Sequence, residues 1–389
     1  MRDGQLLSTI EILTQLVAFD TTSRNSNLPL IHWVRDYLDG HAVASRLTYD
    51  AGGTKANLHA VIGPAVEGGL ALSGHVDTVP VDGQNWSSDP FTLRQQDGRV
   101  FARGATDMKG FVASMLAAVP DIRAMPLVRP VHLFISYDEE VDCDGARVLM
   151  RDLEADGLKP ALCIVGEPSL MKPIIAHKGR LSVRVTVRGH AGHSSQPGQG
   201  VNAIHAAAEA IAHIAAEQRR FATSGRREAG FEPEHSTIHV GLAAGGSILN
   251  IIPDRAGFDM EWRTIPGDDA HAELAALKAH VATHIEPWMH AVDPESGFVF
   301  DPMDELPPLA LDPHHELVAL VKQAGGANQE GKVSYGTEAG IYQNAGIVSI
   351  VCGPGDIAQA HRPDEWVALS QLEACAAFIR RIATRLTRT

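Results

Sequence analysis

The sequence contains few cysteines and no long apolar stretch. Its four cysteines, Cys143, Cys163, Cys352 and Cys375, are widely separated and form no CxxC pair. This spacing favours buried free thiols in a reducing compartment over a disulfide framework or a thiolate metal site. No apolar run approaches the roughly 18 consecutive residues that a membrane span requires. We therefore expect no membrane partner.

Basic residues are outnumbered by acidic ones. Lys and Arg total 33 against 47 Asp and Glu, so the net charge is 33 − 47 = −14, and no basic cluster stands out. Nucleic acid is therefore not expected as a partner. The opening segment MRDGQLLSTIEILTQL contains Asp3 and Glu11 and lacks a small-residue cleavage site, which argues against a signal peptide. We predict a cytoplasmic protein.

The first part of the chain alternates strand and helix patterns. Short apolar runs of strand length, LALSGH, PVHLFISY and ALCIVG, are separated by the helical patterns MKGFVASMLAAV and DGARVLMRDLEA. Ser8 and Glu11 form a capping-box pattern before a further helix. This alternation predicts an α/β domain with a mainly parallel sheet. Ligands of such sheets bind beyond the carboxyl ends of the strands.

The middle of the chain has a different order of elements. LSVRVTVRG alternates as a half-buried strand, an Ala-rich helix follows from 201 to about 220, and STIHVGLAAGG and AGFDMEWRTI are two more strands. A helix over DAHAELAALKAHVATHI and a short strand near GFVF complete a ferredoxin-like β-α-β-β-α-β order. We predict that 180–302 is inserted into a catalytic domain formed by 1–179 and 303–389. The charged segment 218–234 is expected to be a loop.

Five segments scattered over the chain place metal-binding types of side chain after apolar runs. They supply His75 with Asp77 in SGHVDTVP, Asp107 in ARGATDMKG, Glu139 and Glu140 in SYDEEVD, Glu167 in VGEPS and His361 in AHRPDEW. Imidazole and carboxylate without thiolate suit zinc, manganese or cobalt, and two such ions can share a bridging water at roughly 3.5–4 Å. The pattern indicates a two-metal hydrolase that needs no nucleophilic side chain.

Each of these residues also has an ordinary structural interpretation. A single histidine is more often a satisfied core or turn residue, and the acids between 138 and 144 resemble a solvated loop. Asp77 strengthens the metal hypothesis, because residues i and i+2 of an extended segment face the same side and a carboxylate commonly orients a ligating histidine. Several coincidences at predicted strand ends favour a joint site.

Several motifs give the chain a resemblance to a known family. SGHVDTVP, GRVFARGATDMKG, DEE, GEP, RGHAGHSS, GVNAI and GGSILNIIPD resemble the M20 metallopeptidases along nearly the whole length. CGPGDIAQAHRPDEW is similar to the deacetylase subgroup that acts on acetylornithine. One departure is Asp142, where the family pattern has glycine, so the conformation of that turn is open.

The resemblance implies a zinc-peptidase-like catalytic domain, an inserted lid or dimerisation domain, and two divalent ions, zinc or alternatively cobalt. In the family pattern His75 and Glu167 hold one ion, Glu140 and His361 hold the other, and Asp107 bridges them. Glu139 is then the general base that activates a metal-bridging water, and Asp77 orients His75. The pattern also implies a cis peptide bond after Asp107.

On the substrate side, the resemblance places His193 as a donor to the oxyanion, often in a partner subunit of a homodimer. Asn250 and Arg263 match substrate-binding residues, and a guanidinium suits the carboxylate of an N-acyl amino acid. In GTEAG, formed by Gly336, Thr337 and Glu338 with the next two residues, the acid either pairs with the ornithine amine or braces the turn. The implied reaction is hydrolysis of N2-acetyl-L-ornithine to L-ornithine and acetate, in arginine biosynthesis.

Other functions stay open from the sequence. Succinyl-diaminopimelate desuccinylase would require a further cation for the second carboxylate of its acyl group, and a broad aminoacylase or dipeptidase is a further alternative. A non-catalytic, metal-stabilised scaffold is disfavoured because Glu139, the proposed base, is present although structure does not require it.

Overall fold

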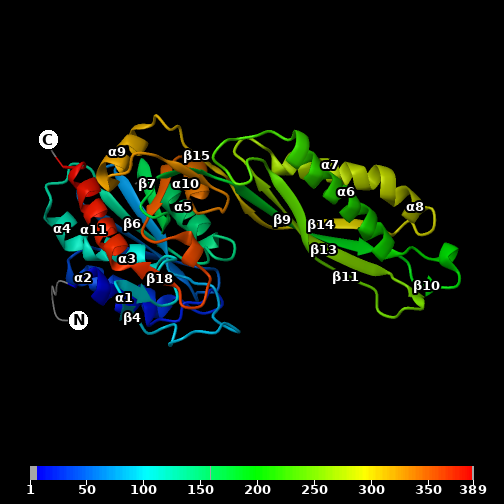
Figure 1. Ribbon diagram of the computed structural model, residues 1–389, viewed down its shortest axis with the longest axis horizontal. Helices are drawn as coiled ribbons and strands as arrows, with labels where there is room; N and C mark the ends of the chain where they lie inside the picture. The colour runs from blue at the N-terminus through cyan, green and yellow to red at the C-terminus, as the bar shows by residue number, and fades with distance from the viewer. Residues whose placement is uncertain (1–6, 158, 388–389) are drawn as a thin grey trace. The chain divides into compact units, whose positions relative to one another are not determined.

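The chain folds into two compact units. The computed structural model describes residues 7–157 and 159–387, so Asp3 lies outside the described residues. Unit 1 comprises the described residues of Met1–Ala176, Leu309–Lys332 and Thr337–Thr389, and unit 2 comprises His177–Pro308 and Val333–Gly336 (Figure 1). The chain thus leaves unit 1 to form unit 2 and then returns to it.

Unit 1 is built on a mixed sheet whose centre is parallel. Among the described residues its nine strands follow the order β1-β2-β6-β3-β7-β17-β8-β15, with β16 paired to β8. The central strands β6 (Val131–Ser136), β3 (Leu70–His75), β7 (Leu162–Pro168) and β17 (Val348–Gly353) are mutually parallel. The flanking strands are β1 (Ser45–Tyr49), β2 (Ala56–Ile62), β8 (Ile174–His177), β15 (Leu309–Ala310) and β16 (Gly331–Val333). The predicted α/β class with a mainly parallel sheet is confirmed.

Helices cover both faces of this sheet. In Figure 1, α3 (Lys109–Ala117) and α11 (Leu369–Thr384) lie on one side, and α5 (Asp144–Asp156) and α10 (Ala339–Asn344) lie on the other. Helix α1 (Thr9–Val17) begins at the predicted capping box of Ser8 and Glu11, which is confirmed. The remaining helices of unit 1 are α2 (Leu28–Gly40), α4 (Val119–Ala124) and α9 (Glu316–Gly325), and a small sheet joins β18 (Trp366–Ala368), β5 (Arg99–Phe101) and β4 (Arg94–Gln96).

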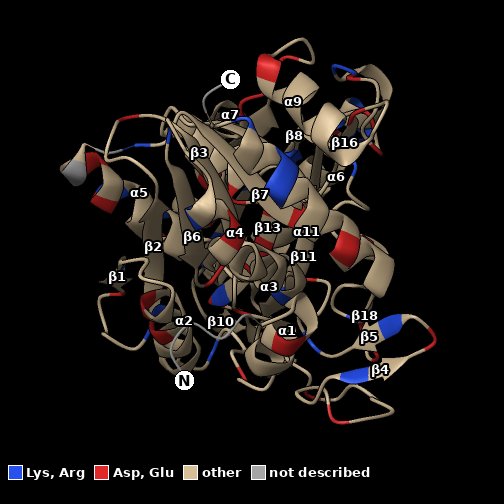
Figure 2. Cartoon of the chain, turned by 90° about the vertical axis from the view of Figure 1, so that its left-hand side faces the viewer, with Lys and Arg blue, Asp and Glu red and all other residues tan. Residues whose placement is uncertain are grey.

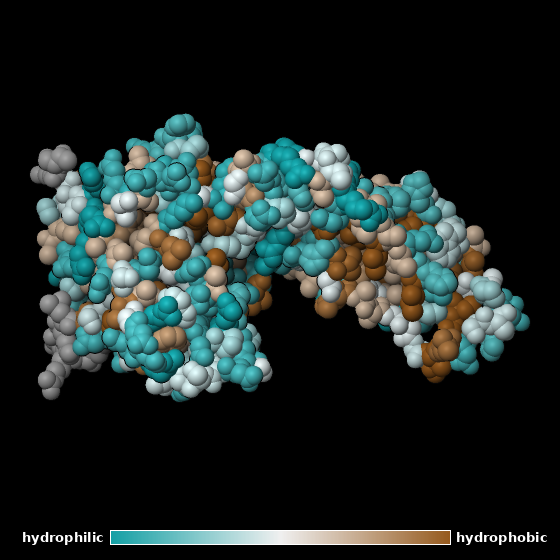
Figure 3. Space-filling view, in the orientation of Figure 1, coloured by the Kyte–Doolittle hydropathy of each residue, from teal (hydrophilic) through white to brown (hydrophobic). Residues whose placement is uncertain are grey.

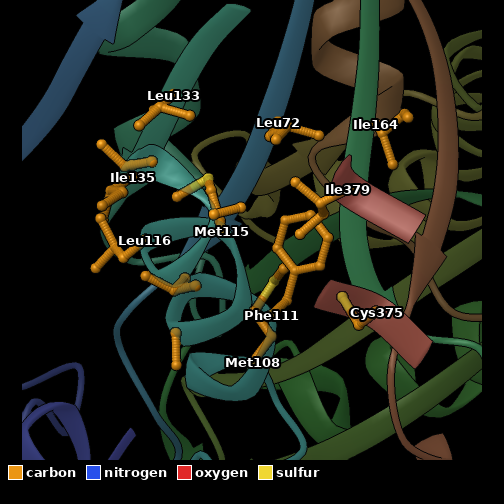
Figure 4. Close-up of a cluster of buried hydrophobic side chains, with 14 of the residues drawn as sticks. Leu72, Met108, Phe111, Met115, Leu116, Leu133, Ile135, Ile164, Cys375 and Ile379 are labelled. Carbon is orange, nitrogen blue, oxygen red and sulfur yellow. The ribbon is translucent and has the colours of Figure 1, made fainter. Parts of the chain in front are cut away.

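The packing of α3 on the sheet is unusually close. Phe111 of α3 points toward the strands that carry Leu72 and Ile164 (Figure 4). A Cβ atom on Gly166 would lie 1.9 Å from Cγ of Phe111, so only glycine permits this approach at the end of β7. Because α3 starts two residues after Asp107, this contact fixes where that carboxylate lies.

Unit 2 has the predicted β-α-β-β-α-β order. Its strands β9 (Gly179–Arg188), β11 (Thr237–Gly245), β13 (Arg255–Thr264) and β14 (Gly297–Leu306) form an antiparallel sheet in the order β11-β13-β9-β14. The helical elements are α6 (Ala203–Ser224), α7 (Ala270–His280), a π-helical turn (Val281–Ile285) and α8 (Glu286–His290), while β10 (Gly192–His193) pairs with β12 (Ile251–Ile252). Burial alternates along β9 and β13, as expected for a sheet covered on one face.

Two elements of unit 2 differ from the sequence-based expectation. Strand β14 is ten residues long rather than short, because its pairing with β9 continues past a bulge. Helix α6 runs to Ser224, through the first part of the segment expected to be a loop. Phe221 is buried in the core there, and Arg220 pairs with Glu273. Tertiary contacts therefore extend both elements beyond their local pattern.

Charged residues of both signs are spread over the ribbon. In the view of Figure 2, acidic and basic residues are interspersed on the helices and loops of unit 1. No helix within residues 7–157 and 159–387 is long and apolar enough to cross a membrane.

Candidate metal centre

His75, the last residue of β3, lies at the centre of a buried group of acids. Its side chain is fully buried, and its Nε2 lies 3.1 Å from Oδ1 of Asp107 and 3.6 Å from Oε1 of Glu167. Glu139 is farther away, with 4.0 Å between its Oε2 and the same nitrogen. The carboxyl ends of β3, β6 and β7 bring His75, Glu139 and Glu167 together, as predicted for ligands of a parallel sheet, and Asp107 joins them from the loop before α3.

Asp107 connects two histidines from distant parts of the chain. Its Oδ1 faces His75, and its Oδ2 lies 3.4 Å from Nε2 of His361. The peptide bond between Asp107 and Met108 is cis, which confirms the bond predicted from the family resemblance. One carboxylate thus presents a separate oxygen to each half of the site.

His361 and Glu140 form the second half. Nε2 of His361 lies 2.9 Å from Oε2 of Glu140. The ligand-type atoms of two groups, His75 with Glu139 and Glu167, and His75 with Asp107 and Glu140, each lie within 4.8 Å of one another. All five predicted metal ligands and Glu139 are therefore assembled in one place.

The acids gathered here outnumber the two histidines among them. Burial raises the pKa of Glu140 to about 7, and repulsion from Asp107 adds to the shift. Burial also raises the pKa of Glu139 and Glu167 well above their usual range. Hydrogen bonds to Asp107 and Glu140 raise the pKa of His361 to about 10. Carboxylates crowded in this way are stabilised in their charged form by cations.

The residues present fit a pair of divalent ions. Oε1 of Glu167 is buried and has no hydrogen-bond partner among the described residues, although a buried carboxylate oxygen normally has one. The donors are imidazole nitrogens and carboxylate oxygens, the set that zinc and related ions accept. A cation held by this oxygen would supply the missing partner.

Asp77 organises the site through the backbone. The ring Nδ1 of His75 donates to the main-chain carbonyl of Asp77 at 3.0 Å and lies 3.4 Å from its carboxylate. The carboxylate accepts hydrogen bonds from the backbone N–H groups of Glu139 and Glu140 and from the hydroxyl of Ser23. Asp77 therefore fixes the orientation of His75 and the position of both acids.

Sequence reasoning missed Lys55, which holds the acidic loop. Nζ of Lys55 contacts both carboxylate oxygens of Asp138 at 2.5 and 2.6 Å and the carbonyl of Ser23 at 2.6 Å. Asp138 has a φ of 56° and Cys143 a φ of 58°, whereas Asp142 is not among the positive-φ residues. The departure at Asp142 therefore requires no glycine-like conformation.

Glu338 is enclosed behind the site. It is 1% exposed, and the hydroxyl of Tyr342 donates to its Oε2 at 2.8 Å while lying 2.9 Å from the hydroxyl of Ser73. Burial raises the pKa of Glu338. Thr337 is fully buried beside it, whereas Gly336 belongs to unit 2. These contacts favour a bracing role for the GTEAG turn over a salt bridge with a substrate amine.

The predicted site residues of unit 2 have local partners. His193 is exposed, and the backbone N–H of Ser195 donates to its Nδ1 at 3.2 Å, which leaves the proton of the neutral ring on Nε2. Asn250 is exposed, and Nε of Arg263 lies 3.1 Å from a carboxylate oxygen of Glu261. His193 thus presents a hydrogen-bond donor, while Arg263 already has an acidic neighbour.

Comparisons with known proteins agree with this site. Residues 71–385 match the model of peptidase family M20/M25/M40. The chain is 34% identical over 379 residues to an acetylornithine deacetylase of Proteus mirabilis (strain HI4320), covering 94% of this chain and 93% of that protein. The chain belongs to the M20/M25/M40 family, and the resemblance inferred from its motifs is confirmed. It is a metal-dependent amidohydrolase of this family.

Solved structures share the fold over most of the chain. An M20 family metallo-carboxypeptidase from Sulfolobus solfataricus superposes with a TM-score of 0.73 at 17% identity, over 97% of this chain and 99% of the other. The Bacillus subtilis YXEP protein, a dinuclear metal binding peptidase of the M20 family, gives 0.67 at 17% identity over 97% of both chains. At these identities the likeness establishes the architecture only.

Proposed function

We propose that this chain hydrolyses N2-acetyl-L-ornithine to L-ornithine and acetate, a reaction of arginine biosynthesis. The observation that supports the substrate most directly is the 34% identity to an acetylornithine deacetylase over 94% of the chain. The site supports the reaction class, because two histidines and four carboxylates lie together. One of these carboxylates, Asp107, faces both histidines.

In this proposal Glu139 is the general base. Two divalent ions, when bound, polarise the acyl carbonyl and make water easier to deprotonate. Glu139 accepts the proton of the attacking water and later delivers it to the nitrogen of the leaving amine. The carboxylate of Asp77 accepts a hydrogen bond from the backbone N–H of Glu139 at 3.1 Å. Glu139 is therefore positioned before the reaction begins, which lowers the entropy cost of the reaction step.

The proposed residues hold the ions through imidazole and carboxylate donors. His75 and Glu167 would hold one ion, Glu140 and His361 would hold the other, and Asp107 would be shared between them. Zinc is the proposed metal, with cobalt as a substitute, because both accept nitrogen and oxygen donors at low coordination number. We also propose that the enzyme acts in the cytoplasm.

A substrate panel tests the specificity. Purified enzyme with added zinc or cobalt is assayed for amine release from N2-acetyl-L-ornithine, N-succinyl-L,L-diaminopimelate, N-acetyl-L-methionine and a dipeptide, with Glu139→Gln as the inactive control. We expect kcat/KM for acetylornithine to exceed the others by about tenfold or more, equivalent to 1.4 kcal/mol. A preference for the succinylated substrate would replace the proposal with desuccinylation, and a preference for the dipeptide would replace it with peptidase activity.

We further propose that unit 2 is a lid and dimerisation domain. It exposes large apolar side chains, with Leu242 68%, Ile248 62% and Leu249 99% exposed, and β11 is an edge strand. Figure 3 shows hydrophobic surface over the strands of this unit. Contiguous exposed apolar surface of this kind commonly marks an interface. Light scattering on wild type and on Leu249→Ser measures the mass, and a wild-type monomer would contradict dimerisation.

A further inference from the structure

An ion pair outside the ligand set is completely enclosed in unit 1. Arg103 and Glu365 are each 1% exposed, and Nη1 of Arg103 lies 2.7 Å from Oε2 of Glu365. Removing two charges from water is costly, and a buried pair stabilises a fold only when its other hydrogen bonds are satisfied. The partners of this pair therefore indicate what it does.

Glu365 binds the backbone that leads to the bridging ligand. Its Oε1 accepts hydrogen bonds from the backbone N–H groups of Thr106 at 2.8 Å and Asp107 at 3.1 Å. Its Oε2 accepts one from the backbone N–H of Gly104 at 3.1 Å, in addition to that from Arg103. One carboxylate thus accepts three backbone hydrogen bonds from the loop that ends in Asp107.

Arg103 binds the segment that carries the other histidine. Its Nη1 lies 3.4 Å from the carbonyl oxygen of Arg362, and its Nη2 donates to Oε1 of Gln84 at 2.6 Å. The side-chain amide of Gln84 in turn donates to the carbonyl oxygen of His361 at 3.0 Å. Arg103 therefore reaches the main-chain carbonyl of Arg362 directly and that of His361 through Gln84.

We propose that Arg103, Glu365 and Gln84 form a clamp that sets the relative positions of Asp107 and His361, and thereby the spacing of the two halves of the metal centre. The inference rests on the proposed function, because it assigns these positioning residues to the same site. The clamp acts on backbone atoms: Glu365 holds the N–H of Asp107, and Gln84 holds the carbonyl of His361.

The charge of the clamp supports this role. The positive charge of Arg103 balances Glu365, so the pair fixes the ligand loops without adding net negative charge beside a centre that already contains four acids. A neutral residue in place of Glu365 would leave a buried guanidinium and three backbone donors with weaker partners. The ligand side chains would then still be present, but the loops that carry them would no longer be held in their relative positions.

Cobalt binding provides the test, because its visible absorption reports ligand geometry. Metal-free wild type, Glu365→Gln and Gln84→Ala are titrated with Co²⁺ while absorption and heat are recorded. Loss of a residue that orients metal ligands typically weakens binding by about 10- to 100-fold. We expect a loss of this size for both ions in Glu365→Gln, since Asp107 contacts both halves. In Gln84→Ala we expect weaker binding of only one ion, with an altered spectrum.

Arg46→Met is the matched control. It breaks an ion pair between Arg46 of β1 and Asp152 of α5, two elements that carry none of the predicted metal ligands. Equal cobalt affinities and spectra in wild type, Glu365→Gln and Gln84→Ala would overturn the clamp while leaving the proposed function intact. If Glu365→Gln does not fold, Gln84→Ala decides alone. A wild-type protein that binds no pair of cobalt ions would overturn the proposed function and the clamp together.

Discussion

The two units bury their strands in different ways, and this difference separates their functional residues. In unit 1, β3 and β6 are buried along their entire length, because helices cover both faces of the sheet. In unit 2, β9 and β13 alternate buried and more exposed residues. In the doubly covered sheet the metal-type side chains gather at or just beyond the carboxyl ends of β3, β6 and β7, where they converge on one another. Those of the half-covered sheet remain separate and keep local partners.

The largest expected effects fall on the converged residues. Asp107→Ala should abolish binding of a metal pair and activity, because one carboxylate faces both His75 and His361. Glu139→Gln should retain both ions and lose turnover by about 10²- to 10⁴-fold, the usual contribution of a general base. Metal analysis and kcat of both purified variants give the result. A metal-free Glu139→Gln protein would contradict the division of roles.

His193→Ala tests whether an exposed residue of unit 2 takes part in catalysis. We expect kcat to fall by about 10²- to 10³-fold, as for loss of an oxyanion donor. The unfolding midpoint should stay at the wild-type value, since the side chain is exposed and its hydrogen bond is to the neighbouring Ser195. Denaturant unfolding and steady-state kinetics of the same preparation separate the two effects. Unchanged kcat would confine catalysis to unit 1.

Acid should destabilise unit 1 through a buried histidine pair. Nε2 of His59 lies 3.1 Å from Nδ1 of His132, whose Nε2 donates to a carbonyl, and burial lowers the pKa of both rings to about 4. Because the folded pKa lies below the ordinary value of 6.5, their stabilisation is complete above pH 6.5. It is lost as pH falls toward 4, where the unfolded chain binds more protons.

The variant His59→Gln should show a shallower loss of unfolding free energy over this pH window. Glutamine retains a donor for His132 but does not titrate. His205→Gln, an exposed position on α6, serves as the control and should follow the wild-type curve. Denaturant unfolding at half-unit steps from pH 4 to 7 provides the measurement, and identical slopes for His59→Gln and wild type would count against the assignment.

Two glycine substitutions compare the packing of the units directly. Gly166→Ala would place a methyl group against Phe111 and should cost about 1–3 kcal/mol of unfolding free energy, as overpacking does in dense cores. Gly198→Ala in unit 2 meets no atom within 4 Å and should change stability by no more than about 0.5 kcal/mol. Chemical denaturation measures both. Similar costs at the two positions would contradict the difference in packing.

The smallest effect is expected for Glu338→Gln. The amide oxygen can still accept the hydrogen bond of Tyr342, so we expect less than about a tenfold change in kcat/KM, below 1.4 kcal/mol. The change should be equal for acetylornithine and an acetylated neutral amino acid of similar length. A loss confined to acetylornithine would instead assign Glu338 to the substrate amine.

Local patterns in the sequence were sufficient to predict much of the fold. The apolar runs ending at His75 and Gly166 predicted strands whose ends lie together, and the Ser8–Glu11 capping box predicted the start of α1. Alternation along 181–189 predicted a half-covered sheet. Local pattern failed where distant contacts dominate: α6 continues to Ser224 because Phe221 is buried against the rest of unit 2.

By itself the sequence determined the chemistry of this protein, because histidine and carboxylate side chains after apolar runs define both the donors and the sheet edge where they meet. The tertiary structure alone decided how these donors are held. Glu365 reaches the backbone of Asp107 across 258 positions of the chain, and Lys55 reaches Asp138 across 83. Such contacts join a side chain to the main chain or to a remote loop. Such contacts produce no recognisable motif in the sequence. Almost any residue supplies the same backbone N–H, and only the folded chain brings it within hydrogen-bond distance.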